Sequence, residues 1–295
     1  MPPHSFIEKC FLETDTHNNL EMLGTSFGYR GTAVNVLIGT PVHCQDIYVI
    51  DKFMSNQKQI QQSYPSSELI LATSEYDFIK ELESLVSFWR LRGTVLHYEV
   101  VKPDYARSRL WNIACGREAI RNYTLFQTEA SYLLFLDADM TFEPSVIRIM
   151  ENEIQGYDVV FSGYPLQRYG IGLAGAGCMM LTRNTLDKIR FRCYEFKNGE
   201  VIFEDSVVEM DLFRLRSRIK KGFFVSVDHY ASATDAIRIT AQPVGLLRRI
   251  ANCAFARYAL IRASIMLKYN IPWKLKVGLS RLRTAIERQS HTDKI

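Results

Sequence analysis

The 295-residue sequence contains no pair of cysteines in a C-x-x-C spacing. Scattered single cysteines of this kind indicate neither a disulfide framework nor a zinc site. They are typical of reduced, mostly buried thiols in a cytosolic protein. The six cysteines are Cys10, Cys44, Cys115, Cys178, Cys193 and Cys253.

The sequence also lacks a long uninterrupted apolar run. The most apolar helical stretch, residues 251–267, is broken by Arg257 and Arg262. It therefore falls short of the ~18 consecutive apolar residues that indicate a membrane-spanning helix. The first residues carry acidic side chains and no basic region followed by an apolar core, so we expect no signal peptide. These absences favour a cytoplasmic location.

A large charge of one sign is likewise absent, because the formal net charge is only +4. We therefore expect no nucleic-acid partner. The charge is unevenly distributed, since residues 243–295 hold eleven Lys or Arg and two acidic residues, which leaves the rest of the chain net acidic. A basic tail suits an anionic membrane surface, so one expectation is peripheral contact with the cytoplasmic face of a membrane. The other is a solvated helical extension.

An apolar run that leads into two aspartates is the most informative stretch present. Residues 132–136 read Tyr-Leu-Leu-Phe-Leu, which predicts a fully buried parallel strand. Because buried carboxylates are costly, Asp137 and Asp139 should lie beyond its carboxyl end, where open α/β sheets bind ligands. Two hard oxygen donors there suit Mn²⁺ or Mg²⁺ bound to a phosphate group.

Strands alternate with helices on both sides of this stretch. This alternation predicts an α/β fold with a mostly parallel sheet and helices on both faces. We expect an N-terminal extension over 1–32, one α/β domain over 33–242 and a basic helical extension over 243–295. Predicted strands cover 33–39, 68–73, 94–101, 132–136 and 158–162, and predicted helices cover 46–63, 76–91, 105–122 and 144–154.

The rhythm changes after residue 164. Residues 170–177 hold four glycines and precede a short apolar run at 178–181. Further on, the pattern predicts a basic helix over 210–221, stopped by Gly222, and then a strand over 223–227.

Residues 34–229 resemble a nucleotide-sugar glycosyltransferase of the GT-A fold, most similar to the large family 2 type. The resemblance places Thr40 and Pro41 at the base and ribose, and Thr73 in a second nucleotide-contacting loop. Ala106–Asn112 resembles an Ala-Arg-x-x-Asn motif of that family. In it, Arg109 and Asn112 would bind the nucleotide sugar, since an Arg at a helix start can reach a diphosphate.

The resemblance also implies the remaining site residues. Gly175, Gly177 and Glu204 would lie on the acceptor side. The catalytic base would be Asp205, from the Glu-Asp pair, or Asp211, which has the better spacing to the following glycine. Asp137 and Asp139 would bind the metal, and Asp137 also the nucleotide sugar, with His229 as a third metal ligand.

The implied activity is transfer of a sugar from a nucleoside-diphosphate sugar to a hydroxyl of a glycan, protein or lipid-linked acceptor, with inversion. Two alternatives stay open. A phosphatase of the haloacid dehalogenase type would use Asp137 as nucleophile and Asp139 as general acid. A non-catalytic protein of the same fold would bind a nucleotide sugar or a glycan.

Overall fold

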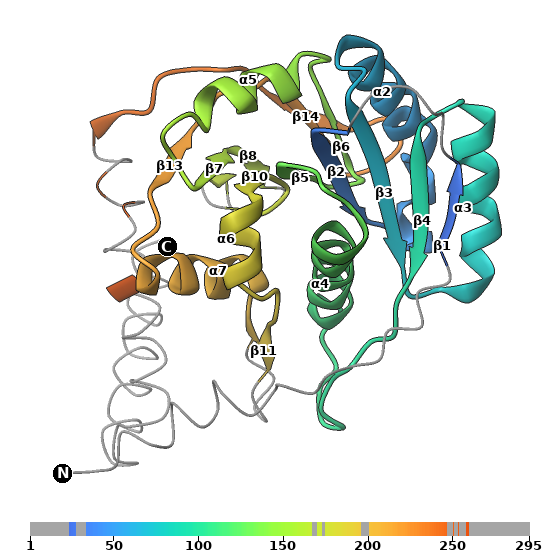
Figure 1. Cartoon of the computed structure of the whole chain (residues 1–295), viewed down its shortest axis with the longest axis horizontal. Helices are drawn as coiled ribbons and strands as arrows, with labels where there is room; N and C mark the ends of the chain where they lie inside the picture. The colour runs from blue at the N-terminus through green and yellow to red at the C-terminus, as the bar shows by residue number, and fades with distance from the viewer. Residues whose placement is uncertain are drawn as a thin grey trace, which may run out of the picture.

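The computed structural model describes residues 24–27, 34–166, 170–172, 175–195, 201–246, 250, 253 and 258–259. Its centre is an eight-stranded sheet in the order β1-β4-β3-β2-β5-β10-β7-β13 (Figure 1). All of these strands except β1 and β10 run in the same direction. Their bounds are β1 (Gly24–Phe27), β2 (Val36–Pro41), β3 (Ser67–Thr73), β4 (Gly93–His97), β5 (Tyr132–Leu136), β7 (Val159–Ser162), β10 (Cys178–Thr182) and β13 (Ile219–Gly222).

Helices cover both faces of the sheet (Figure 1). Phe53 of α2 and Leu82 of α3 pack on one face, together with α5, whereas Ile120 of α4 and Leu212 of α7 pack on the other, together with α6. The predicted α/β fold with a mostly parallel sheet between helices is confirmed. The helices are η1 (Cys44–Tyr48), α2 (Ile50–Ser63), α3 (Tyr76–Phe88), α4 (Leu110–Gln127), α5 (Val146–Glu153), α6 (Arg183–Lys188) and α7 (Glu204–Arg214).

Three smaller sheets accompany the central one. The first, in the order β15-β14-β6, places Met140 opposite His229, and so brings the chain just after β5 beside a segment about ninety residues later. The other two are hairpins, β8 with β9 and β11 with β12. Bounds are β6 (Met140–Phe142), β8 (Tyr164–Leu166), β9 (Gly170–Gly172), β11 (Tyr194–Glu195), β12 (Val201–Ile202), β14 (Val227–Tyr230) and β15 (Ala236–Ile239).

The two predicted extensions differ in how much of them the structure describes. Within 1–32, the described strand β1 pairs antiparallel with β4 and so forms an edge of the central sheet. Most of 243–295, including the two predicted basic helices, lies outside the described residues. In the described part of the chain, no helix has the length and apolar character needed to cross a membrane.

The helix predicted over 105–122 is shifted along the chain, because α4 covers Leu110–Gln127. The residues before it are held by a distant carboxylate instead of by helical hydrogen bonds. Glu195 accepts from the backbone N–H groups of Arg107 and Ser108, both at 2.8 Å. A tertiary contact therefore sets where this helix begins.

The predicted helix over 210–221 is correct only up to residue 214, and the predicted strand over 223–227 was wrong. Helix α7 covers Glu204–Arg214 and is followed by Arg216 in a left-handed conformation, with φ of 54°. The chain then forms β13 beside β7, and β14 starts only at Val227. Lys221, one of the basic residues that suggested a helix, is in strand β13 and forms an ion pair with Glu209 of helix α7.

Candidate functional site

The two aspartates lie directly beyond the carboxyl end of β5. The Asp137 and Asp139 side chains each expose 28% of their surface, whereas Ala138 between them is buried. The backbone N–H of Asp137 donates to the carbonyl of Gly177 at 3.2 Å, which continues the pairing of β5 with β10 past the strand end. Both acids are therefore accessible at the sheet edge where parallel strands end.

A buried arginine links this edge to helix α7. Arg117 of α4 exposes only 3% of its side chain and donates through Nη2 to Asp137 Oδ1 at 2.5 Å. Through Nη1 it pairs with Glu204, the first residue of α7. Arg117 was missed by the sequence reasoning. The available signal was its spacing of three residues from both Ala114 and Ile120, which puts a cation on the apolar face of the helix.

The charged groups in this network shift one another's pKa values. Burial raises the pKa of Asp137, against the opposing effect of Arg117, and the charge of Asp139 raises it further. Burial likewise raises the pKa of Glu204 to about 7, although Arg117 acts in the opposite direction. Burial alone would lower the pKa of Arg117, but the two carboxylates raise it above its ordinary value. The guanidinium therefore stays charged and compensates more than one buried carboxyl group.

Asp139 is held by strand β14. Its Oδ2 lies 3.0 Å from His229 Nε2, and its carbonyl accepts from the N–H of Tyr230 at 2.9 Å. The ring of Tyr164 meets His229 edge-on, with ring centroids 6.1 Å apart. The structure thus brings together the predicted residues Asp139 and His229, which are ninety positions apart in the sequence.

Two glycines allow this close packing. A Cβ atom on Gly177 would collide with Asp137 Oδ2, and one on Gly175 would collide with the hydroxyl of Tyr164. The N–H of Gly177 also donates to that hydroxyl at 3.3 Å. These contacts give the glycines a packing reason to be there, and their predicted acceptor-side role stays a prediction.

The structure separates the two candidate bases. Asp205 is half-buried in the first turn of α7, and its charge raises the pKa values of both Glu204 and Tyr164, although burial is the larger cause in each case. Asp211 instead forms a bidentate ion pair with Arg192 at 2.7 and 3.0 Å. Six residues of helix put Asp211 about 9 Å further along α7. Of the two candidates, Asp205 is therefore the one that lies next to Glu204, at the end of α7 that Arg117 joins to Asp137.

The predicted nucleotide-binding residues lie at the ends of β2 and β3 and at the start of α4. Buried Thr40 donates from its hydroxyl to the carbonyl of Leu136 at 2.8 Å, and buried Thr73 accepts from the N–H of Glu75 at 3.2 Å. Both threonine side chains are thus used in packing these strand ends. The binding roles of these residues stay predictions.

Of the other predicted nucleotide-binding residues, Pro41 ends β2 and is half-buried. Arg109 is exposed just before α4. The carbonyl of Asn112 accepts from the hydroxyl of Tyr98 at 2.8 Å.

Two further residues face the aspartates from the loop after β2, and sequence reasoning did not find them. Burial raises the pKa of Asp46, and the charges of Asp139 and Asp137 raise it further. Tyr48 donates from its hydroxyl to the carbonyl of Tyr230 at 3.0 Å. No strand-end motif marks either residue, because the contacts depend on how η1 packs against β14.

The donor atoms suit a divalent cation that binds together with a phosphate group. In the described residues, Asp137, Asp139 and His229 do not form a compact set of three ligand atoms, since such a set occurs only elsewhere. Mg²⁺ sites for phosphate substrates typically use one or two carboxylates plus phosphate oxygens and water, so such a set is not required. The carboxylate of Asp139 beside the imidazole of His229 is also compatible with Mn²⁺.

No protein-family model and no curated protein matches the chain. Among solved structures, S. aureus TarS 1-349 in complex with UDP-GlcNAc is similar with 12% identity and a TM-score of 0.47, over 79% of this chain and 66% of that one. The mannosyltransferase PcManGT from Pyrobaculum calidifontis, in complex with GDP-Man and Mn²⁺, has 12% identity and a TM-score of 0.43, over 64% and 55%. A197 from STIV has 15% identity and a TM-score of 0.41, over 71% and 95%. Each is a likeness of backbone arrangement, and none specifies what this chain binds.

Proposed function

We propose that this chain is a metal-dependent glycosyltransferase that moves a sugar from a nucleoside-diphosphate sugar to an acceptor hydroxyl. The observation that carries the proposal is the position of Asp137 and Asp139, both partly exposed beyond the end of the central strand, with Asp137 joined through Arg117 to the acidic start of α7. A divalent cation site and a carboxylate base then lie on one side of the sheet. In a direct displacement, the cation stabilises the leaving diphosphate and the base takes the proton of the acceptor hydroxyl.

Asp139, with His229 and Asp137, would hold Mn²⁺ or Mg²⁺ there. When bound, the cation supplies positive charge that stabilises the departing diphosphate. The chain's own contribution is to hold these acids in position. Arg117 fixes Asp137, and the backbone of Tyr230 together with the ring of His229 fixes Asp139.

Asp205 is the proposed base. Its carboxylate takes the proton of the acceptor hydroxyl, whose oxygen forms a bond to the anomeric carbon of the donor. The bond from that carbon to the diphosphate oxygen breaks, and the nucleoside diphosphate leaves with the electron pair. A direct displacement of this kind inverts the anomeric centre. Inversion rests on the resemblance seen in the sequence.

The test is to incubate the protein with a panel of nucleotide sugars and acceptors, with and without a chelator, and to measure the release of nucleoside diphosphate. We expect release that needs Mn²⁺ or Mg²⁺ and is lost in Asp139→Asn and Asp205→Asn. Asp211→Asn is the matched control, because it removes the ion pair to Arg192 further along the same helix. It should lower stability and leave turnover similar.

Other outcomes would favour the alternatives. Release of inorganic phosphate from phosphomonoesters, abolished by Asp137→Asn, would support a phosphatase. Binding of a nucleotide sugar with no turnover across the panel, unchanged in Asp205→Asn, would support a non-catalytic binding protein.

A further inference from the structure

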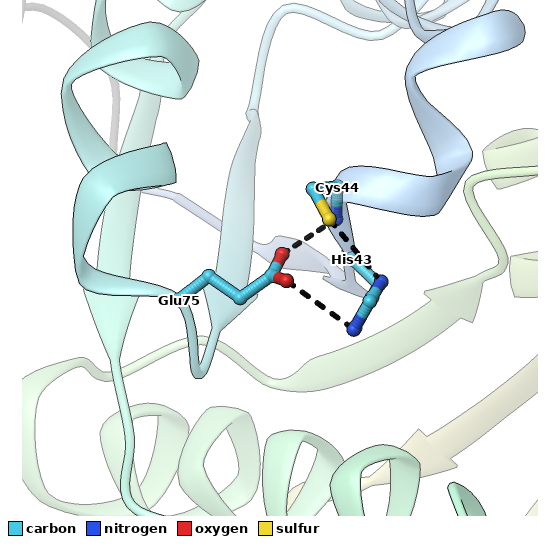
Figure 2. Close-up of side chains that lie close together, drawn as sticks. All are labelled: His43, Cys44 and Glu75. Atoms are coloured by element: carbon cyan, nitrogen blue, oxygen red, sulfur yellow. Dashed lines mark hydrogen bonds and ion pairs between the residues drawn. The ribbon is translucent and has the colours of Figure 1, made fainter.

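Three metal-binding residue types meet at the same edge of the sheet, in the segments that follow β2 and β3 (Figure 2). His43 and Cys44 follow β2, and Glu75 follows β3, its parallel neighbour. An imidazole nitrogen, a thiol sulfur and a carboxylate oxygen lie within 4.8 Å of one another there, which no other trio of such residues does in the described part of the chain.

Hydrogen bonds hold the three groups in place. Glu75 Oε2 accepts from the N–H of Cys44 at 2.6 Å, and Glu75 Oε1 lies 3.3 Å from His43 Nε2. The N–H of Gln45 donates to His43 Nδ1 at 3.1 Å. These contacts assign the proton of the neutral imidazole to Nε2 and the lone pair to Nδ1.

The remaining lone pair lies close to the thiol. His43 Nδ1 and Cys44 Sγ are 3.7 Å apart. Zinc bound tetrahedrally to sulfur at about 2.3 Å and nitrogen at about 2.0 Å separates these two ligand atoms by roughly 3.5 Å. The spacing is therefore close to that of two zinc ligands, and a small rotation of either side chain would complete it.

We propose that His43 Nδ1, Cys44 Sγ and a carboxylate oxygen of Glu75 bind one zinc ion, with the fourth position open to water or a ligand. A thiol and an imidazole favour zinc over Mg²⁺, in contrast to the hard oxygens of Asp137 and Asp139. Cys44 is exposed and its two partners are half-buried, so an ion can enter from solvent. The proposal departs from the sequence expectation of no zinc site, because Cys44 and Glu75 meet only through strand pairing.

Binding of zinc would replace the thiol proton of Cys44. An exposed thiol is protonated at neutral pH in the absence of a metal ion. Zinc then takes the thiolate sulfur as a ligand, and the thiol proton is released to solvent. His43 Nδ1 would give up the hydrogen bond that it accepts from the N–H of Gln45 and would bind the metal with the same lone pair. Zinc affinity should therefore rise with pH.

The test is a zinc titration of the full chain against a chromophoric chelator, in excess Mg²⁺ so that the carboxylate site is occupied. We expect one zinc ion per chain. Cys44→Ser and His43→Ala should weaken binding by more than about 100-fold, the upper range for loss of an outer partner. Co²⁺ in place of zinc should give a thiolate-to-cobalt charge-transfer band that Cys44→Ser abolishes.

Two control variants make the result specific. Cys253→Ser removes another exposed cysteine and should bind zinc like the unmodified chain. Asp139→Asn should also bind zinc normally while losing sugar transfer, so the zinc site and the proposed function can fail independently. Circular dichroism checks that each variant is folded. The proposal would be overturned if Cys44→Ser left the zinc affinity unchanged. It would also be overturned if the unmodified chain and all variants bound zinc only weakly and equally.

Discussion

Arg117 donates to Asp137 Oδ1 at 2.5 Å from a side chain that exposes only 3% of its surface. The same guanidinium pairs with Glu204, so one buried cation joins the end of β5 to the start of α7. The acid expected to face the donor and the helix expected to carry the base thus share a single charged partner. Movement of Arg117 would disturb both.

Arg117→Met should lower the free energy of unfolding by about 3–5 kcal/mol at pH 8, because it leaves buried carboxylates without their cation. Urea denaturation measures this difference. Arg190→Met is the control, since Arg190 is 53% exposed and lies 3.7 Å from its partner Glu118. That substitution should cost less than about 1 kcal/mol. Equal stability of the two variants would show that Arg117 is not a structural link.

Gly177→Ala should reduce sugar transfer on the order of 100-fold, because the added methyl group collides with Asp137 Oδ2 and displaces an acid that we propose binds the metal. The measurement is turnover at saturating Mn²⁺. Gly245→Ala is the control, since a Cβ there meets no atom within 4 Å. If the two variants turned over at the same rate, Asp137 would not need its present position.

His229→Asn should weaken Mn²⁺ binding about 10–100-fold, whether the imidazole binds the ion or orients Asp139. Titration calorimetry in the presence of nucleoside diphosphate measures the affinity. His97→Asn serves for comparison, because His97 lies at the end of β4 beside Tyr76, with ring centroids 6.0 Å apart. Unaltered Mn²⁺ affinity in His229→Asn would place the cation elsewhere.

The pH dependence of stability should change in Glu204→Gln. The folded-state pKa of Glu204 is raised to about 7 by burial, from an ordinary value near 4.5. The stabilising contribution of the protonated carboxyl is therefore complete below about pH 4.5 and is lost as pH rises through 7, up to roughly 3 kcal/mol.

Urea denaturation of both proteins from pH 5 to about pH 8 checks this. The advantage of the unmodified chain over Glu204→Gln should shrink as the pH increases across that range. A difference that stays constant with pH would mean that Glu204 titrates in its ordinary range.

Local sequence patterns were sufficient to predict a strand that is buried on both of its faces. The apolar run at Tyr132–Leu136 matches β5, and the acids after it lie at the strand end as predicted. The positions of α2, α3 and α5 follow the predicted helices closely, since each helix has an amphipathic repeat that can be seen in its own sequence. The sequence predicted less well after residue 200, where basic residues of β13 suggested a helix.

The sequence by itself determined the α/β alternation, the central strand and the two carboxylates at its end, because hydrophobic periodicity and the cost of burying charge act locally. Only the tertiary structure decided which partners these acids have. Arg117 of α4 pairs with Asp137 and also with Glu204 of α7, and His229 of β14 contacts Asp139. The trio of His43, Cys44 and Glu75 likewise depends on two parallel strands lying side by side. Such contacts follow from strand order and helix packing, which no local spacing of residues records.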